Sequence, residues 1–113
     1  MRWLLRSKIH KATITSTNIN YVGSMGIDKA LIKKVGILPG EKILVVDNTN
    51  GARLETYVIK EKEGSGRVVI YGAAARLIKK GDEVIIMGFE LGSKPIKIKN
   101  ILVDKKNKFV KFL

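Results

Sequence analysis

A glycine-serine pair, Gly23-Ser24, has the residue types for the most unusual chemistry in this sequence. It lies in "NYVGSMGID" at positions 20–28, after a strand-like run and before a helix start, with Tyr21 two residues upstream. A serine hydroxyl becomes a nucleophile when its surroundings activate it, and glycine permits backbone conformations that expose a neighbouring carbonyl. An isolated Gly-Ser is more commonly a turn, because serine also bonds its local backbone. The rest of the chain has to decide between these interpretations.

Two rows of polar side chains are the next candidates for chemistry. Lys8 and His10 are two residues apart, as are Arg53, Glu55 and Tyr57, and side chains two apart on a strand share a face. A solvated strand face is the commoner interpretation of such rows. Alternatively, Arg53 could clamp an anion while Tyr57 donates a proton, which are the two roles that a site for a small dicarboxylate needs.

The composition excludes several classes of chemistry. The chain has no cysteine, so disulfides, thiolate metal ligands and cysteine nucleophiles are excluded, and we expect a cytoplasmic protein. His10 is the only histidine, and the segment "EGSG" at 63–66 is too short to cradle a phosphate. No apolar run is long enough to span a bilayer. We therefore predict no metal site and no membrane partner.

The formal net charge of +12 raises the question of a nucleic-acid partner, because clustered lysine and arginine bind phosphate. Half of the excess lies in a lysine-rich tail, residues 94–113, which holds seven lysines and one acid. This tail lacks the interleaved arginine or tyrosine that stacks on bases, and elsewhere the two signs of charge are interspersed. We do not expect nucleic-acid binding.

Short strands within a single domain, residues 1–113, must position these side chains. With 45% hydrophobic residues the chain can bury one core of its own. Strand-like runs occupy 9–15, 42–48, 52–60, 67–71 and 83–89, and further short strands are expected at 96–103 and 108–113. The turn-forming "NTNG" at 48–51 predicts a hairpin between the second and third runs.

Two short helices are expected between the strands. Asp28 is a suitable N-cap for a helix that ends at Val35, and Gly36 is a suitable C-cap. A helical turn is expected from Ala73 to Ile78. Many short strands with two small helices favour a compact β-barrel.

Several segments of the chain resemble the pyruvoyl-dependent aspartate 1-decarboxylases, which make β-alanine for pantothenate and coenzyme A. These segments follow the family's order and spacing over residues 1–90, whereas the tail has no close match. They are "SKIHKATIT" at 7–15, "YVGSMGID" at 21–28, "NGARLETY" at 50–57, "GSGRVVIYGAAAR" at 64–76 and "GDEVIIM" at 81–87.

This resemblance implies a mainly β fold, namely a small six-stranded double-psi β-barrel with short helices. It also implies a homotetramer with active sites at subunit interfaces, and it leaves the need for a maturation helper open. The family cleaves itself, which here would give residues 1–23 (the β chain) and residues 24–113 (the α chain).

The resemblance gives the Gly23-Ser24 pair a covalent role. In the family the serine hydroxyl attacks the glycine carbonyl to form an ester, elimination leaves dehydroalanine, and hydrolysis of dehydroalanine produces the pyruvoyl group. Thr56 is similar to the threonine that steadies the oxyanion of this shift. Strand alternation directs Thr56 away from Arg53 and Tyr57, so a twist, a bulge or a site shared between subunits has to reconcile them.

The resemblance further implies that the pyruvoyl ketone replaces pyridoxal phosphate and forms a Schiff base with the substrate, L-aspartate. Tyr57 would return a proton to the α-carbon, while Arg53 and Lys8 would hold the carboxylate that stays. The matching residues with lining or supporting roles are His10, Tyr21, Gly72, Ala73, Ala74 and Ala75.

Tyr71 departs from the family pattern, which usually has asparagine before Gly-Ala-Ala-Ala. Either the site has widened around the tyrosine ring, or the cleavage segment is held less well. We expect slow processing that Tyr71→Asn would accelerate. The opposite result would mean that the tyrosine hydroxyl has taken over the hydrogen bond of the asparagine.

The alternative is a protein of another class, an uncleaved, non-enzymatic basic β-barrel that binds nucleic acid or a protein partner. An enzyme of the pyruvoyl kind has to consist of two chains, whereas a binding module stays one chain.

Overall fold

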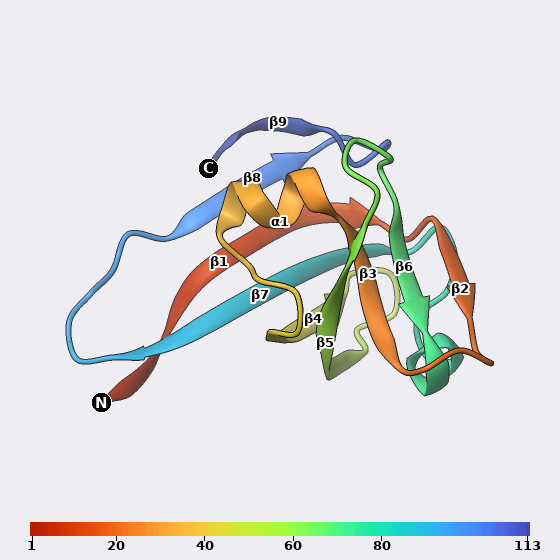
Figure 1. Ribbon diagram of the computed structural model, residues 1–113, viewed down its shortest axis with the longest axis horizontal. Helices are drawn as coiled ribbons and strands as arrows, with labels where there is room; N and C mark the ends of the chain where they lie inside the picture. The colour runs from red at the N-terminus through yellow and green to blue at the C-terminus, as the bar shows by residue number, and fades with distance from the viewer.

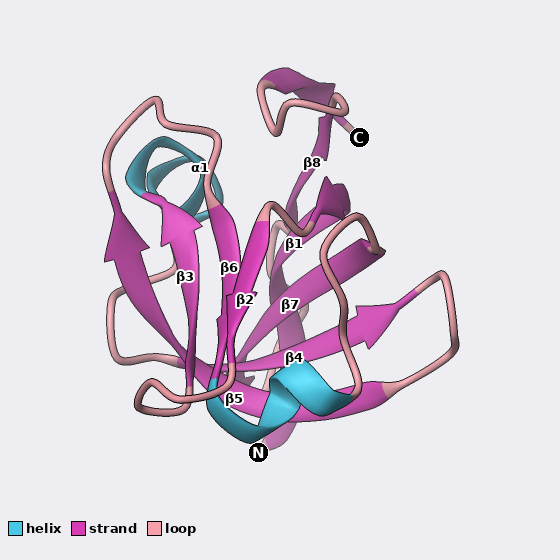
Figure 2. Ribbon diagram, turned by 90° about the vertical axis from the view of Figure 1, so that its right-hand side faces the viewer, coloured by secondary structure: helices cyan, strands magenta, loops and turns pink.

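The strands form one nine-stranded sheet that curls around a single hydrophobic core (Figure 1 and Figure 2). The computed structural model describes residues 1–113. The sheet order is β2-β6-β3-β5-β4-β7-β1-β8-β9. In chain order the elements are β1 (Arg2–Thr13), β2 (Ser16–Asn18), β3 (Ser24–Asp28), α1 (Lys29–Val35), β4 (Lys42–Asp47), β5 (Arg53–Glu61), β6 (Val68–Tyr71), the 3-10 helix η1 (Gly72–Arg76), β7 (Glu83–Gly92), β8 (Lys99–Val103) and β9 (Phe109–Phe112).

The expected mainly β fold and small barrel are confirmed, and so is the hairpin of β4 and β5. These two strands pair antiparallel, with Ile43 opposite Thr56. The structure has nine strands where the resemblance implies six, because the tail contributes β8 and β9 and the short β2 pairs with β6. The core comes from alternate residues of the strands. In β4, for example, Ile43 and Val45 are buried while Leu44 and Val46 are only half-buried on the outer side.

Helix α1 begins and ends at the predicted caps. Asp28 accepts a hydrogen bond from the Ala30 amide at 2.8 Å, and Gly36 ends the helix at φ 76° in the left-handed region. The helix packs Leu31, Ile32 and Val35 into the core. No helix of the protein is long and apolar enough to cross a membrane.

The lysine-rich tail is part of the sheet. Strand β8 pairs parallel with β1, and β9 pairs antiparallel with β8. The turn between β8 and β9 is anchored by Asn107, which is 1% exposed. Its side chain accepts from the Thr13 amide and donates to the carbonyl oxygens of Thr13 and Gly66, each at 2.8 Å. The tail is therefore tied to β1 and to the loop before β6.

The sequence patterns do not predict β2 or β3. All five residues of β3 are buried, because the strand lies between β5, with which it is parallel, and β6, with which it is antiparallel. A strand that is covered on both faces normally has a continuous hydrophobic run. Ser24, Gly26 and Asp28 interrupt that run in β3, so the sequence does not reveal the strand. This unpredicted strand carries the Gly-Ser serine.

Candidate active site

Ser24 is the first residue of β3, and strand pairing determines its surroundings. It stands opposite Tyr71 in the antiparallel pair of β3 and β6, so the two side chains leave the sheet on the same face. Ser24 is 2% exposed, and its hydroxyl donates to the Val22 carbonyl oxygen at 3.1 Å. The hydroxyl is thus directed back along the chain, toward the segment that contains the Gly23 carbonyl.

Gly23 packs against Gly72, the first residue of η1. Gly72 has φ +81°, and a β-carbon on it would lie 2.6 Å from the Gly23 Cα and 3.4 Å from the Tyr21 carbonyl oxygen. Only glycine fits this contact, because a side chain would displace the backbone next to the Gly-Ser bond. The structure thus brings Gly72 beside Gly23 and Ser24.

The three alanines after Gly72 have different environments. Ala75 is a member of the core, Ala74 packs against the core from the side, and Ala73 is exposed. Packing around η1 explains the small side chains of Ala74 and Ala75, and Ala73 alone is open to a ligand.

Strand β5 separates the predicted residues onto two faces, as its sequence alternation indicates. Arg53 and Tyr57 are exposed on the outer face, and Thr56 points to the inner face on which Val58 is buried. Val58 pairs with Met25 of β3, so the same register continued by two residues brings Thr56 level with Gly23. Thr56 therefore lies level with Gly23, and by the same register Tyr57 lies level with Ser24 on the other face of β5, whereas Arg53 lies beyond the start of β3.

Lys8 and His10 lie on β1, well away from Arg53. One continuous cross-strand row runs over the outer face of the sheet, and it consists of Lys8, Met87, Leu44 and Glu55. Two strands therefore separate β1 from β5, which corresponds to roughly 14 Å along the sheet for three strand spacings of about 4.8 Å. A single chain does not bring the predicted carboxylate-binding residues together.

The outer face also has unsatisfied polar atoms. His10 Nδ1 and Asn100 Oδ1 are buried and have no hydrogen-bond partner. Asn100 is the β8 partner of Lys8, so both atoms belong to the same region of β1 and β8. Buried polar atoms are normally hydrogen-bonded, so these two atoms are exceptions within the chain.

Half-buried apolar side chains cover the sheet between these two groups of residues. A groove of about 490 Å³ lies on this side, next to the 70% exposed ring of Trp3. The half-buried side chains are Leu44, Val46, Ile85, Met87 and Phe89. A sheet face with this composition is typical of a surface that packs against another layer.

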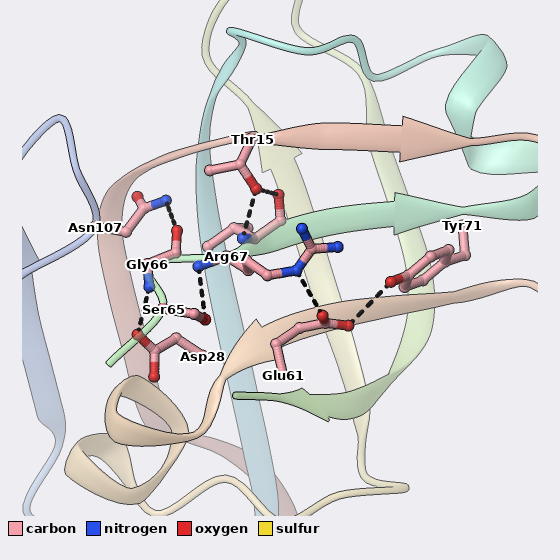
Figure 3. Close-up of polar contacts among 9 residues, drawn as sticks. Thr15, Asp28, Glu61, Ser65, Gly66, Arg67, Tyr71 and Asn107 are labelled. Carbon is pink, nitrogen blue, oxygen red and sulfur yellow. Dashed lines mark hydrogen bonds and ion pairs between the residues drawn. The ribbon is translucent and has the colours of Figure 1, made fainter. Parts of the chain in front are cut away.

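The Tyr71 side chain is held by contacts at both of its ends. Its hydroxyl donates to Glu61 Oε2 at 3.0 Å, while the Arg67 guanidinium donates to Glu61 Oε1 at 2.8 Å (Figure 3). Its ring packs at a tilt against Tyr21, with 4.8 Å between the ring centroids. Burial, assisted by the Glu61 carboxylate and opposed by Arg67, raises the pKa of Tyr71 above its ordinary value of 10.0. The hydroxyl is therefore a hydrogen-bond donor at neutral pH.

No sequence pattern singles out Glu61, Arg67 or Gly26, although the structure brings them together. Glu61 ends β5 and reaches over β3, which lies between β5 and β6, to contact the two β6-side residues. A β-carbon on Gly26 would lie 2.8 Å from Glu61 Cδ and 2.9 Å from Cγ, so the missing side chain makes room for the carboxylate. The opposite charges at 61 and 67, on either side of a glycine-rich loop, were the available signal.

This arrangement offers a buried serine hydroxyl beside two contacting glycines, with Thr56 level with the same bond. On the outer face it offers Arg53 as an anion ligand and Tyr57 as a proton donor. No three histidine, aspartate or glutamate side chains are grouped closely enough to bind a metal ion. The residues are therefore suited to acyl chemistry on the chain itself and to binding of a carboxylate.

Comparison with known proteins identifies the relatives of this chain. A family model described as aspartate decarboxylase matches residues 1–110. The aspartate 1-decarboxylase of Bacillus subtilis (strain 168) is 53% identical over 92 residues, which are 81% of this chain and 72% of the relative. The aspartate 1-decarboxylase of Thermotoga petrophila is 50% identical over 106 residues, 94% of this chain and 93% of the relative. That of Caldicellulosiruptor saccharolyticus is 51% identical over 112 residues, 96% and 88% of the two chains.

Proposed function

Because the chain belongs to the aspartate decarboxylase family, we propose that it is an aspartate 1-decarboxylase, which converts L-aspartate to β-alanine and carbon dioxide. The observation that carries this proposal is the placement of Ser24. Its hydroxyl is buried at the start of β3, and the preceding Gly23 is in tight contact with Gly72.

The proposed maturation step is cleavage of the Gly23-Ser24 bond. The Ser24 Oγ attacks the Gly23 carbonyl carbon, the C–N bond breaks, and an ester joins the two residues. Elimination then releases the Gly23 carboxylate as the end of chain 1–23 and leaves dehydroalanine at position 24. Addition of water and loss of ammonia convert dehydroalanine to a pyruvoyl group. Thr56, level with Gly23 by register, supplies a hydroxyl for the oxyanion of the first step.

A pyruvoyl group at position 24 fits the observed surroundings. Gly72 has no side chain there, and the pairing of β3 with β6 would hold the group at the start of the strand. The group supplies a ketone that withdraws electrons from the α-carbon of a bound amino acid. Two side chains have the other roles in the reaction. Arg53 binds the carboxylate that is retained, and Tyr57 donates a proton to the α-carbon.

The proposed site is shared between subunits of a homotetramer. Two strands separate Lys8 from Arg53 within one chain, so we infer that the Lys8 and the Arg53 that hold one substrate come from different chains. The unpartnered atoms of His10 and Asn100 and the apolar outer face support this arrangement, because a second subunit would cover them.

Denaturing mass spectrometry tests the proposal. The purified protein should consist of residues 1–23 and 24–113, with a carbonyl at the start of the longer chain that borohydride reduces. Ser24→Ala should remain one chain. The sequence offers a matched control in Gly64-Ser65, a second Gly-Ser pair in an exposed loop, which should stay intact and whose Ser65→Ala variant should mature normally.

A chain that stays whole after prolonged warm incubation, with candidate helper proteins added, would overturn the cleavage proposal and favour the uncleaved binding barrel. Formation of β-alanine from aspartate by the cleaved protein, but not by Ser24→Ala, completes the test.

A further inference from the structure

Glu61 is the centre of a bridge over the strand that carries Ser24. The sheet order places β3 between β5 and β6, and the Glu61 carboxylate spans β3 to accept hydrogen bonds from Tyr71 and Arg67 (Figure 3). The Glu61 side chain is only 13% exposed, and its contact with Tyr71 is partly buried, whereas its contact with the 47% exposed Arg67 is open to water. Hydrogen bonds to a shielded carboxylate are among the stronger ones in proteins, so they hold the Tyr71 hydroxyl in one position.

The Tyr71 ring transmits this constraint to the segment before the cleavage site. Residues 19–23 connect β2 to β3, and their large side chains are exposed, with Ile19 at 41%, Tyr21 at 53% and Val22 at 69%. The Tyr21 amide reaches the Asn18 carbonyl oxygen only at 3.4 Å, a long hydrogen bond. The packing of the Tyr21 ring on Tyr71 is therefore the main side-chain anchor of this segment.

We propose that Glu61 is a positioning residue for the reaction at Ser24, because it fixes the Tyr71 ring against Tyr21 and so holds residues 19–23 in the conformation from which the Gly23-Ser24 bond is cleaved. The inference rests on the proposed function and extends it to a residue outside the reacting atoms. Gly26 is needed for this arrangement, since only a residue without a side chain leaves room for Glu61 above β3.

The contacts of Tyr71 distinguish between the two interpretations of this residue. Gly26 leaves room for the Glu61 carboxylate, and this carboxylate is the defined hydrogen-bond partner of the Tyr71 hydroxyl. An asparagine at position 71 is too short to reach Glu61 and has no ring to pack on Tyr21. We therefore expect Tyr71→Asn to slow cleavage in this protein, contrary to the expectation from the sequence.

The first experiment measures how fast residues 24–113 form in freshly purified protein. Glu61→Ala should slow cleavage about tenfold, the factor that corresponds to loss of one hydrogen bond to a charged group. Glu61→Gln keeps an acceptor for Tyr71 and should recover part of the rate. Glu63→Ala is the matched control, because Glu63 is the next acid along the chain and contacts only the exposed Lys33, at 3.4 Å. It should cleave at the unmodified rate.

A double-mutant cycle separates positioning through Tyr71 from a general structural role. Tyr71→Phe keeps the ring and removes the hydroxyl, so in that background Glu61→Ala should have little further effect. A tenfold loss in both backgrounds would overturn the inference, and so would a Glu61→Ala protein that cleaves at the unmodified rate.

A second readout does not depend on cleavage. In the whole chain of Ser24→Ala, hydrogen exchange at the amides of residues 19–23 should become faster when Glu61→Ala is added, while exchange in β7 stays the same. Unchanged exchange at 19–23 would overturn the inference even if the unmodified protein cleaves. Conversely, faster exchange in a protein that never cleaves would uphold the bridge and overturn the proposed function.

Discussion

Gly72 lies against Gly23, so closely that a β-carbon on Gly72 would be 2.6 Å from the Gly23 Cα. The contact joins the start of η1 to the residue before the Gly-Ser bond. It restricts both backbones, since Gly72 also has φ +81°, in the region that favours glycine.

Gly72→Ala should therefore block formation of residues 24–113, because the new methyl group displaces Gly23. Gly81→Ala is the control for backbone strain alone, since Gly81 has φ +91° but no atoms within 4 Å of an added β-carbon. Both variants pay about 1–2 kcal/mol for the left-handed conformation. Denaturing mass spectrometry should show cleavage in Gly81→Ala only, and equal cleavage in both would contradict the role of the contact.

Arg53→Ala should cleave normally and lose aspartate decarboxylation. Arg53 is exposed on the outer face of β5 and makes no hydrogen bond or ion pair with the cleavage segment, so we expect its loss to affect substrate binding alone. We expect kcat/KM to fall about tenfold to a hundredfold, as for loss of a charge-assisted contact. Arg53→Lys keeps the charge without the planar guanidinium and should be intermediate. Full activity in a completely cleaved Arg53→Ala protein would remove Arg53 from the site.

Co-expression of two inactive variants tests the sharing of sites between subunits. Lys8→Ala and Arg53→Ala should each have little activity alone. A mixed oligomer contains sites in which Lys8 from one subunit meets Arg53 from the other, so part of the activity should return. Steady-state β-alanine formation by the co-purified mixture, compared with each variant alone, provides the measurement. No recovery in a verified mixed oligomer would mean that both residues act within one chain.

Asn107→Ala should destabilise the protein, because it leaves the Thr13 amide and the carbonyl oxygens of Thr13 and Gly66 without partners. We expect a loss of about 3 kcal/mol in the free energy of unfolding. Asn107→Gly accommodates φ 60° without strain, so its comparison with the alanine variant separates the side-chain bonds from the backbone effect. Urea unfolding in the Ser24→Ala background keeps the chain whole. A change below 1 kcal/mol in both would contradict the anchoring role.

The raised pKa of Asp47 predicts that the stability of the protein depends on pH. Asp47 is 0% exposed, and burial, together with the neighbouring Asp82 carboxyl group, raises its pKa above the ordinary 3.8, although the amides of Thr49 and Asn50 oppose the shift. The folded protein therefore holds this proton more tightly than the unfolded chain does. The contribution to stability is present below pH 3.8 and is lost as the pH rises through the raised pKa.

Asp47→Asn should remove this loss, so that the free energy of unfolding falls less between acid and neutral pH than in the parent. Urea unfolding of Ser24→Ala, with and without the substitution, over a pH series checks this. Asp104 is the control of opposite sign, because hydrogen bonds from the amides of Lys108 and Lys106 lower its pKa. Asp104→Asn should lower the free energy of unfolding at pH values above 3.8, where the ionised carboxylate stabilises the folded protein. The same pH profile for both variants would contradict the opposite pKa shifts of Asp47 and Asp104.

Features that depend on residues close together in the chain can be predicted from the sequence. Helix α1 has the caps that Asp28 and Gly36 predict, and the Asn-Gly turn produces the β4–β5 hairpin. The alternation of Arg53, Thr56 and Tyr57 along β5 also follows, because strand geometry sends successive side chains to opposite faces. The resemblance of the segments around Gly23-Ser24 to the family can likewise be recognised without knowing the fold.

The neighbours of each strand in the sheet are known from the three-dimensional structure alone. The position of β3 between β5 and β6 brings Glu61 over Gly26 to Tyr71, and no local pattern indicates that contact. The same order separates Lys8 from Arg53 by two strands. The physical reason is that side-chain periodicity encodes which face of a strand is buried, whereas the choice of neighbouring strand depends on pairing and packing between residues far apart in the chain.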